Sequence, residues 1–397
     1  MRIAFYRVEE ARFPCTVEGG TGIPVSNSCR LEDHLAISKL VGNSGNMVHR
    51  MAMLQLLDFD RANSTQIHIM GLLANLKSAK KVGELINKNF DVLVLTFSNI
   101  IRKGPSETGL LQVLEHLTIP IYAFGIGLQD SLKLSSIDGI DSELLKLLSF
   151  LNNSAVIFGV RGNQTKKYLD SINLNNSIAL GCPSMFAYSW NVLKISPPTS
   201  HERIITAGHF QLTADTSRRI HRLIKGFNGY RPAYVFQGEL KYFKELYMSD
   251  IFDEATQSID FSTINSYVEK KLKIKSPFSK YYSFTETSAW RQAYLQYDLF
   301  IGDRIHGGVV AMQVGKPAVV LHEDARVREL TAYHGIPSCS LKAFEEQGFE
   351  QVIRTELSSQ RIEEFKNRYV SVLNKFVKTL TKNGLKCHIN TSDKSQE

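Results

Sequence analysis

The sequence lacks paired cysteines, long apolar runs and clusters of metal-binding side chains. Its five cysteines are scattered, odd in number and form no CxxC pair, which disfavours a disulfide framework or a structural zinc site and favours a reducing compartment. No run of about 18 apolar residues is present to indicate a transmembrane helix. The first residues, MRIAFYRVEEARF, lack the apolar core of a secretory signal. We therefore expect a cytoplasmic protein without a metal site or a cofactor.

The composition is that of a globular protein with a surplus of positive charge. Hydrophobic residues make up 43% of the chain, charged residues 22%, and the formal net charge is +8. This charge suits an anionic substrate, an acidic membrane surface or nucleic acid, and does not choose among them. Because the basic residues are spread out and no helix-turn-helix, RRM or zinc-finger pattern occurs, we expect no nucleic-acid partner. Peripheral association with the inner face of a membrane stays open.

The length and the strand–helix pattern indicate two domains. A chain of 397 residues is too long for one ordinary core. Short apolar strands alternate with amphipathic helices until the segment KISPPTSHE, which is typical of a linker, and the alternation then restarts. The sequence thus predicts an α/β fold with two Rossmann-like domains facing each other across a cleft. The predicted units are an N-terminal domain (1–193), a C-terminal domain (203–340), helices that pack back on the first domain (341–382) and a frayed tail (383–397).

The segment DLFIGDRIHGGVVAMQVGKPAVVLH (298–322) carries the clearest functional pattern. It contains a short buried strand, a Gly-Asp break, a helix over 305–314 and a second buried strand over 318–321. Arg304 and His306 therefore stand where a parallel strand leads into a helix N-terminus, the edge at which open α/β sheets bind ligands and helix dipoles attract anions. A permanently charged guanidinium near an imidazole that titrates around neutrality suits an anion that must also exchange a proton.

Other residues follow predicted strands at the same edge. Arg161 follows a buried strand, as Arg304 does, and Arg326 follows the second strand of the segment above. Glycines that would let a ligand approach the backbone are Gly125, Gly127, Gly307 and Gly308. Candidate contacts to an acceptor or to a loop are Asn43, Asn46 and Trp290. No full dinucleotide fingerprint is present, so NAD binding is not supported. Cys182 also follows a strand, but without an evident paired histidine we interpret it as a small packed residue.

Five segments resemble those of the polysaccharide pyruvyl transferase family, in that family's order and approximate spacing. They are GNSGN (42–46), AFGIG (123–127), FGVRGNQTKKYL (158–169), GCPSMF (181–186) and GDRIHGGVVAMQVGKPAVVL (302–321). The R-x-H-G motif followed by A-x-x-x-G-x-P is the most specific of them. The turn Gly181-Cys182-Pro183 departs from the D-P of many members.

The resemblance implies a GT-B-like layout and transfer of the pyruvyl group of phosphoenolpyruvate (PEP) to sugar hydroxyls. The acceptor would be a cell-surface or exopolysaccharide glycan or its lipid-linked precursor, and PEP would be a co-substrate. By position, His306 corresponds to the family's catalytic acid, and Arg161, Arg304 and Arg326 to ligands of the donor anion. We expect His306, with a pKa near neutrality, to protonate the methylene carbon of PEP.

Three further questions stay open at this point. The general base is unassigned, with Glu323, Asp324 and Asp303 as candidates by proximity in sequence. A GT-B glycosyltransferase that uses a nucleotide sugar would suit the same strand–helix edges, and a non-catalytic relative that binds anions or glycans would keep the cleft without the acid. Binding to nucleic acid would depend on the net charge alone.

Overall fold

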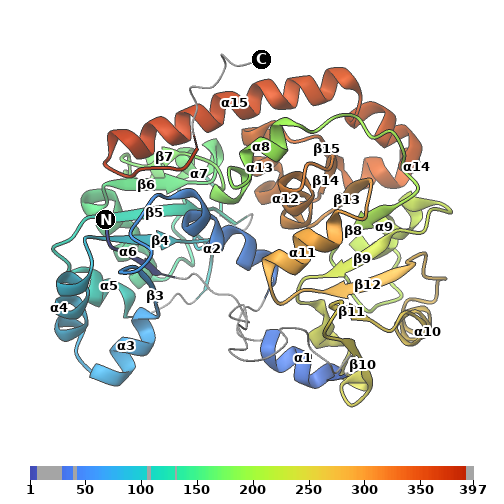
Figure 1. Ribbon diagram of the computed structural model, residues 1–397, viewed down its shortest axis with the longest axis horizontal. Helices are drawn as coiled ribbons and strands as arrows, with labels where there is room; N and C mark the ends of the chain where they lie inside the picture. The colour runs from blue at the N-terminus through green and yellow to red at the C-terminus, as the bar shows by residue number, and fades with distance from the viewer. Residues whose placement is uncertain (7–28, 39–42, 105–108, 130–131, 390–397) are drawn as a thin grey trace.

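The computed structural model describes residues 1–6, 29–38, 43–104, 109–129 and 132–389. Within them, two sheets lie side by side, with helix α2 (Gly45–Leu56) between them (Figure 1). The first sheet has six strands in the order β3-β1-β4-β5-β6-β7, and every neighbouring pair is parallel. Its central strands are buried on both faces, which explains why they read as continuous apolar runs in the sequence.

The elements of this first domain follow one another as alternating strands and helices. The strands are β1 (Ile3–Tyr6), β3 (Thr65–Ile67), β4 (Val92–Thr96), β5 (Ile121–Ile126), β6 (Ile157–Val160) and β7 (Ile178–Ala179). The helices, after α2, are α3 (Ile69–Leu76), α4 (Ala79–Asn89), α5 (Leu110–Leu114), α6 (Ser142–Ser154) and α7 (Asn163–Ser171), and the 3-10 turn η1 (Pro183–Met185) and α8 (Ser189–Leu193) lead out of the domain.

The second sheet has nine strands in the order β15-β14-β13-β8-β9-β12-β11-β10-β2. Six of them form a parallel section: β8 (Ile204–Thr206), β9 (Ala233–Phe236), β12 (Lys280–Ser283), β13 (Leu299–Gly302), β14 (Ala318–His322) and β15 (Ser338–Ser340). An antiparallel extension is formed by β11 (Ser258–Ile259), β10 (Asp250–Asp253) and β2 (Cys29–Arg30). The expected α/β class, with two Rossmann-like domains in a GT-B-like layout, is confirmed.

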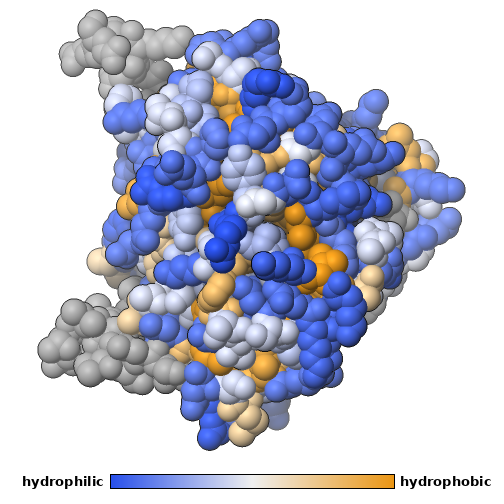
Figure 2. All heavy atoms as spheres, turned by 90° about the vertical axis from the view of Figure 1, so that its right-hand side faces the viewer, coloured by the Kyte–Doolittle hydropathy of each residue, from blue (hydrophilic) through white to orange (hydrophobic). Residues whose placement is uncertain are grey.

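The helices of the second domain complete its layers. They are α9 (Arg219–Phe227), α10 (Phe261–Leu272), α11 (Thr287–Tyr294), α12 (Ile305–Gln313), α13 (Ala325–His334) and α14 (Leu341–Glu356), with the 3-10 turns η2 (Glu239–Tyr242) and η3 (Lys244–Leu246) after β9. Among the helices of the described residues, none combines the length and apolar character that crossing a bilayer requires. Figure 2 shows the face over this domain as mainly hydrophilic, with hydrophobic residues in small separate patches.

Two of the expected boundaries are wrong. Strand β2 and helix α1 (Leu31–Ser38) belong to the second domain, because Arg30 pairs with Asp250 of β10. A strand of two residues gives no periodic signal, so the sequence could not show this exchange. The segment 383–389 is also not frayed: Leu385 is fully buried, and Cys387 forms a β-bridge with Leu57. The remaining residues of the expected tail lie outside the described part of the chain.

Helix α15 (Ser359–Lys382) runs across both domains (Figure 1). Its apolar residues recur every three or four positions and form one buried face. Toward the second domain, the Arg368 Nε–H donates to the Tyr333 carbonyl at 2.9 Å. Toward the first, the Phe376 ring stacks on Phe186 with centroids 4.4 Å apart. Of the C-terminal helices, α15 thus contacts both domains, whereas α14 packs against α9 of the second domain.

We predict that Phe376→Ala lowers the free energy of unfolding by about 3–5 kcal/mol, the usual cost of removing a fully buried phenylalanine. The loss would be measured by urea denaturation followed by circular dichroism. Lys378→Ala, at an exposed position of the same helix, is the control and should change stability little. A loss below about 1 kcal/mol for Phe376→Ala would show that α15 does not hold the domains as described.

Candidate active site

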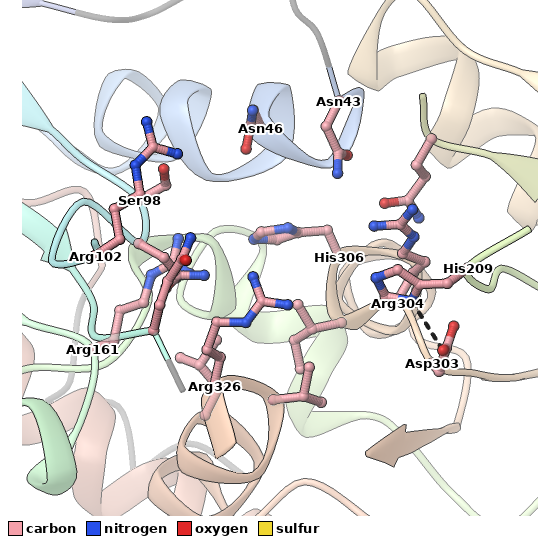
Figure 3. A pocket seen from close by; sticks show the side chains of 16 residues that line it. Asn43, Asn46, Ser98, Arg102, Arg161, His209, Asp303, Arg304, His306 and Arg326 are labelled. Carbon is pink, nitrogen blue, oxygen red and sulfur yellow. Dashed lines mark hydrogen bonds and ion pairs between the residues drawn. The ribbon is translucent and has the colours of Figure 1, made fainter. Parts of the chain in front are cut away.

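A pocket of about 320 Å³ lies between the domains, at the ends of strands from both sheets (Figure 3). This is the edge of parallel α/β sheets at which ligands usually bind. The lining residues come from both domains: Asn43, Asn46, Ser98, Asn99, Arg102, Gln129, Arg161, His209, Gln237, Asp303, Arg304, Ile305, His306, Arg326, Val327 and Leu330. Four of them are arginines and one is acidic, so the pocket favours anions.

The best-defined cation of the pocket is Arg161, which follows β6. Its Nε–H donates to the Gly125 carbonyl and its Nη1–H to Asn99 Oδ1, both at 2.9 Å. The side chain is only 4% exposed, its Nη2 has no hydrogen-bond partner, and no carboxylate within the described residues forms an ion pair with it. Burial lowers the pKa of Arg161, although a guanidinium stays charged at neutral pH. A buried cation held by neutral oxygens alone is suited to a ligand that supplies the negative charge.

The glycines around Arg161 shape its seat. Gly125 has a φ of +76°, and a Cβ there would lie 2.6 Å from the Phe97 carbonyl oxygen. A Cβ on Gly127 would lie 2.8 Å from Arg161 Cδ. These two glycines were expected to contact the donor, but neither lines the pocket. They instead allow Arg161 to lie across the ends of β5 and β6.

The other two expected glycine contacts are also corrected. A Cβ on Gly307 would lie 2.7 Å from the Phe300 ring, and one on Gly308 would lie 2.8 Å from Val320 Cγ2. Both positions face the sheet, where they let α12 pack closely against β13 and β14. The sequence showed that side chains were excluded at these positions, but not which neighbour excludes them.

The remaining arginines differ in how much of their charge is already matched. Arg304 forms an ion pair with Glu239, and its Nε–H donates to the Gly208 carbonyl at 3.2 Å. Arg326 pairs with Asp324 at 2.9 Å. Burial raises the pKa of the Asp324 carboxyl, but the hydrogen bonds and the charge of Arg326 outweigh it and bring the pKa to about 2. Arg102 is exposed, has no ion pair within the described residues and was not anticipated from the sequence.

His306 lies in the first turn of α12 and is buried between cations. Burial, followed by the charges of Arg161 and Arg304, lowers its pKa to about 3. The ring stacks against His49 with centroids 5.4 Å apart. The expectation of a near-neutral pKa is therefore wrong for the protein by itself. Its burial and its arginine neighbours depend on the packing of two domains, which the local sequence does not show.

Cys182 contacts this histidine. Its Sγ lies 3.9 Å from His306 Nε2 and 3.1 Å from Ser184 Oγ, and the thiol is buried. Cys182 is buried, as we interpreted it, but a histidine does contact it. The two residues come from different domains, so the pairing could not be found by proximity in sequence.

The three acidic candidates are all engaged in ion pairs. Asp303 Oδ2 lies 2.9 Å from His209 Nδ1, Glu323 pairs with Arg222 at 2.8 Å, and Asp324 pairs with Arg326. Of the three, only Asp303 lines the pocket. Glu323 and Asp324 are therefore ion-pair partners and do not reach the site.

The asparagines and the tryptophan have different positions. Asn43 and Asn46 line the pocket from the start of α2, where Asn43 Oδ1 accepts a hydrogen bond from the Gly45 N–H at 2.8 Å. Gly42 of the same motif lies outside the described residues. Trp290 is fully buried and stacks on Phe284 with centroids 5.6 Å apart. The expectation that Trp290 contacts an acceptor is wrong, because it is a core residue of the second domain.

Several pocket residues were missed: Ser98, Asn99, Gln129, His209 and Gln237. Each follows a strand of one of the two sheets, as Arg161 does. The available signal was thus a polar residue shortly after an apolar strand. That signal is common in α/β proteins, and it becomes selective only when the strand order is known.

The two sides of the pocket are joined by direct hydrogen bonds between the domains. The Gln313 Nε2–H donates to the Ser184 carbonyl at 2.8 Å, and the Cys182 N–H donates to His334 Nε2 at 3.1 Å. The Thr165 N–H donates to Glu329 Oε1 at 2.6 Å, which satisfies the N-terminus of α7 from across the boundary. These bonds keep Arg161 and His306 at a defined separation.

We predict that the His306 ring stays neutral in the free protein until the pH approaches about 3. Histidine-selective NMR would follow its titration, with the signal assigned by its absence in His306→Ala. Because the unfolded chain would take up the proton near pH 6.5 while the folded protein does not, acid should also destabilise the fold through this group. A folded-state titration close to pH 6.5 would contradict the described burial.

Comparisons with known proteins place this site in context. A family model described as polysaccharide pyruvyl transferase matches residues 53–324. No curated protein matches the chain significantly.

Solved structures give weak matches. UDP-GlcNAc 2-epimerase from Methanocaldococcus jannaschii is 14% identical, with 85% of this chain and 82% of that chain covered and a TM-score of 0.43. The enzyme from Neisseria meningitidis bound to UDP-GlcNAc is 13% identical, with 85% and 88% covered and a TM-score of 0.44. Anabaena HepE in complex with UDP and glucose is 14% identical, with 80% and 85% covered and a TM-score of 0.44.

Proposed function

The chain belongs to the polysaccharide pyruvyl transferase family, whose model matches more than half of its length, and from that membership we propose a specific reaction. The protein transfers the pyruvyl group of PEP to hydroxyls of a sugar and forms a ketal. The acceptor is a cell-surface or exopolysaccharide glycan or a lipid-linked precursor. The reaction takes place in the cytoplasm, where the positive surface allows association with the inner face of the membrane.

The observation that carries this proposal is a surplus of buried donors around one imidazole. Arg161 Nη2 and Gln237 Nε2 are both buried at the pocket and have no hydrogen-bond partner in the described part of the chain. Buried donors of this kind are costly unless a ligand satisfies them. PEP carries a phosphate and a carboxylate, and both are acceptors that suit guanidinium groups.

The arginines take unequal shares of that anion. Arg161 forms no ion pair within the described residues, so it contributes most to binding, and Arg102 adds a cation at the rim. Arg304 is already paired with Glu239, so its main role is to fix the turn that presents His306. The charge of Arg326 is matched only in part by Asp324, because this carboxylate also pairs with Arg219. The N-terminus of α12 adds a favourable dipole on the same side.

The charge of PEP also affects the state of His306. In the protein alone, burial and then the charges of Arg161 and Arg304 keep the imidazole neutral. A bound anion offsets those positive charges and raises the pKa of His306, so that binding of the donor itself prepares the acid. The catalytic acid would thus form only when there is a substrate to protonate.

The π electrons of PEP take the proton of His306, so the methylene carbon becomes a methyl group and C2 becomes oxocarbenium-like. A sugar hydroxyl then bonds to C2 and gives up its proton. The C2–O bond to phosphate breaks with its electron pair leaving on phosphate, and a second hydroxyl closes the ketal. The two hydroxyls release two protons in total. One of them replaces the proton that His306 gave to the methylene carbon, and the other leaves with phosphate.

We predict that His306→Ala still binds PEP but loses about 10²- to 10⁴-fold in transfer rate, the usual contribution of a positioned acid. Transfer would be followed by phosphate release and by the mass gain of an acceptor from a panel of galactosides, glucosides and N-acetylhexosamines. Binding would be followed by thermal denaturation, in which PEP at about 100 times its Kd stabilises the native state by about 2.7 kcal/mol. Retained transfer by His306→Ala would reject the assigned acid.

Arg161→Met is the matched variant for binding. Loss of charge-assisted hydrogen bonds should weaken PEP binding by about 10- to 100-fold while the fold is kept. Stabilisation of the wild-type protein by UDP- or GDP-sugars and not by PEP would instead indicate a nucleotide-sugar glycosyltransferase.

A further inference from the structure

We propose that His209, held by Asp303, is the general base that takes the proton of the attacking acceptor hydroxyl. This inference rests on the proposed function, because it concerns the second half of the same reaction. His306 can give a proton to the donor, but the step also needs a group that removes one from the acceptor. The acidic candidates Glu323 and Asp324 do not line the pocket.

The geometry of His209 is that of an oriented base. His209 follows β8 and Asp303 follows the adjacent strand β13, so the two meet at the same edge of the second sheet. His209 Nδ1 lies 2.9 Å from Asp303 Oδ2, and the dashed line in Figure 3 marks this contact. A carboxylate only accepts hydrogen bonds, so Nδ1 carries the hydrogen and Nε2 presents its lone pair.

Burial differs between the two ends of this pair. The Asp303 side chain is 1% exposed and the His209 side chain 24% exposed. Within the described residues, His209 Nε2 has no hydrogen bond, and the residue lines the same pocket as His306 and Arg161. The carboxylate is thus fixed inside the protein while the imidazole reaches the pocket, which is the arrangement of an orienting acid behind a histidine base.

A further charged group lies beside the pair. Arg219 of α9 lies 3.7 Å from Asp303 Oδ2 and 3.2 Å from His209 Nδ1, and it also pairs with Asp324 at 3.3 Å. The contact of Nδ1 with Asp303 is the shorter of its two contacts, at 2.9 Å. Asp324 in turn holds Arg326. Charged groups therefore run from His209 through Arg219 and Asp324 to Arg326.

In the reaction, the acceptor oxygen forms its bond to C2 of PEP and its proton moves to His209 Nε2. The imidazolium that forms is stabilised by the Asp303 carboxylate. His306 supplies the proton to the methylene carbon in the same event, so the two histidines end with one proton gained and one lost. The second hydroxyl then gives its proton to His306 as it closes the ketal, and His209 gives its proton to the leaving phosphate, so both rings return to their starting states. The acceptor is thereby expected to approach from the His209 end of the pocket.

The test compares His209→Ala with wild type, using the acceptor found in the panel above. We expect the transfer rate to fall by about 10²- to 10⁴-fold, with the stabilisation by PEP unchanged. Added imidazole should restore part of the rate. A fluorinated acceptor, whose hydroxyl is more acidic, should suffer a smaller loss than the parent sugar, because it needs the base less. Asp303→Asn should lower the rate as well, and His116→Ala, at an exposed histidine, should leave it unchanged.

The outcomes separate this inference from the proposed function. If wild type transfers pyruvyl from PEP but His209→Ala keeps its rate within about threefold, the base is wrong and the function stands. If the variant loses rate but neither imidazole nor the acidic acceptor restores it, His209 has a structural role and the inference is overturned. If wild type transfers nothing from PEP, the proposed function itself fails.

Discussion

The site depends on keeping a buried guanidinium that forms no ion pair with a carboxylate of the described residues. Arg161 is held by the Gly125 carbonyl and the Asn99 amide oxygen, which orient it but do not cancel its charge. This arrangement costs desolvation energy in the protein alone, and a bound anion would recover it. Burial lowers the pKa of His306 most, and the charges of Arg161 and Arg304 lower it further. The charge of Arg161 therefore contributes both to the anion preference of the pocket and to the neutral state of its imidazole.

This electrostatic arrangement requires that the two domains be fixed relative to each other. Arg161 belongs to the first domain and His306 to the second, and the Coulomb interaction of buried groups depends on their distance. Hydrogen bonds such as Gln313 to Ser184 cross the boundary close to the pocket, and helix α15 spans it on the outside. The interface between the domains is therefore part of the site, and changes of packing at this interface should change the pKa of His306.

Much of the fold and part of the site could be predicted from the sequence, because both depend on local patterns. Apolar runs of strand length predicted the parallel sheets. Arg161 and Arg304 were predicted as site residues because each follows such a run. What depended on distant packing could not be predicted. The contact of Cys182 with His306 joins two domains, the strand at Cys29–Arg30 is too short for a pattern, and Trp290 has the same residue type whether it faces a cleft or a core. The glycines show most clearly what local sequence cannot predict. A glycine indicates that another group approaches the backbone closely, but not whether that group is a ligand or another part of the protein.

Binding of the donor anion should raise the pKa of His306, so that the imidazole takes up a proton from solvent. Isothermal titration of PEP into the protein, in two buffers with different ionisation enthalpies, measures the protons exchanged on binding. Near pH 7.5 the account predicts uptake of a substantial fraction of a proton by the wild-type protein, and loss of that uptake in His306→Ala with PEP binding retained. Binding without proton uptake, or uptake that persists in His306→Ala, would contradict it.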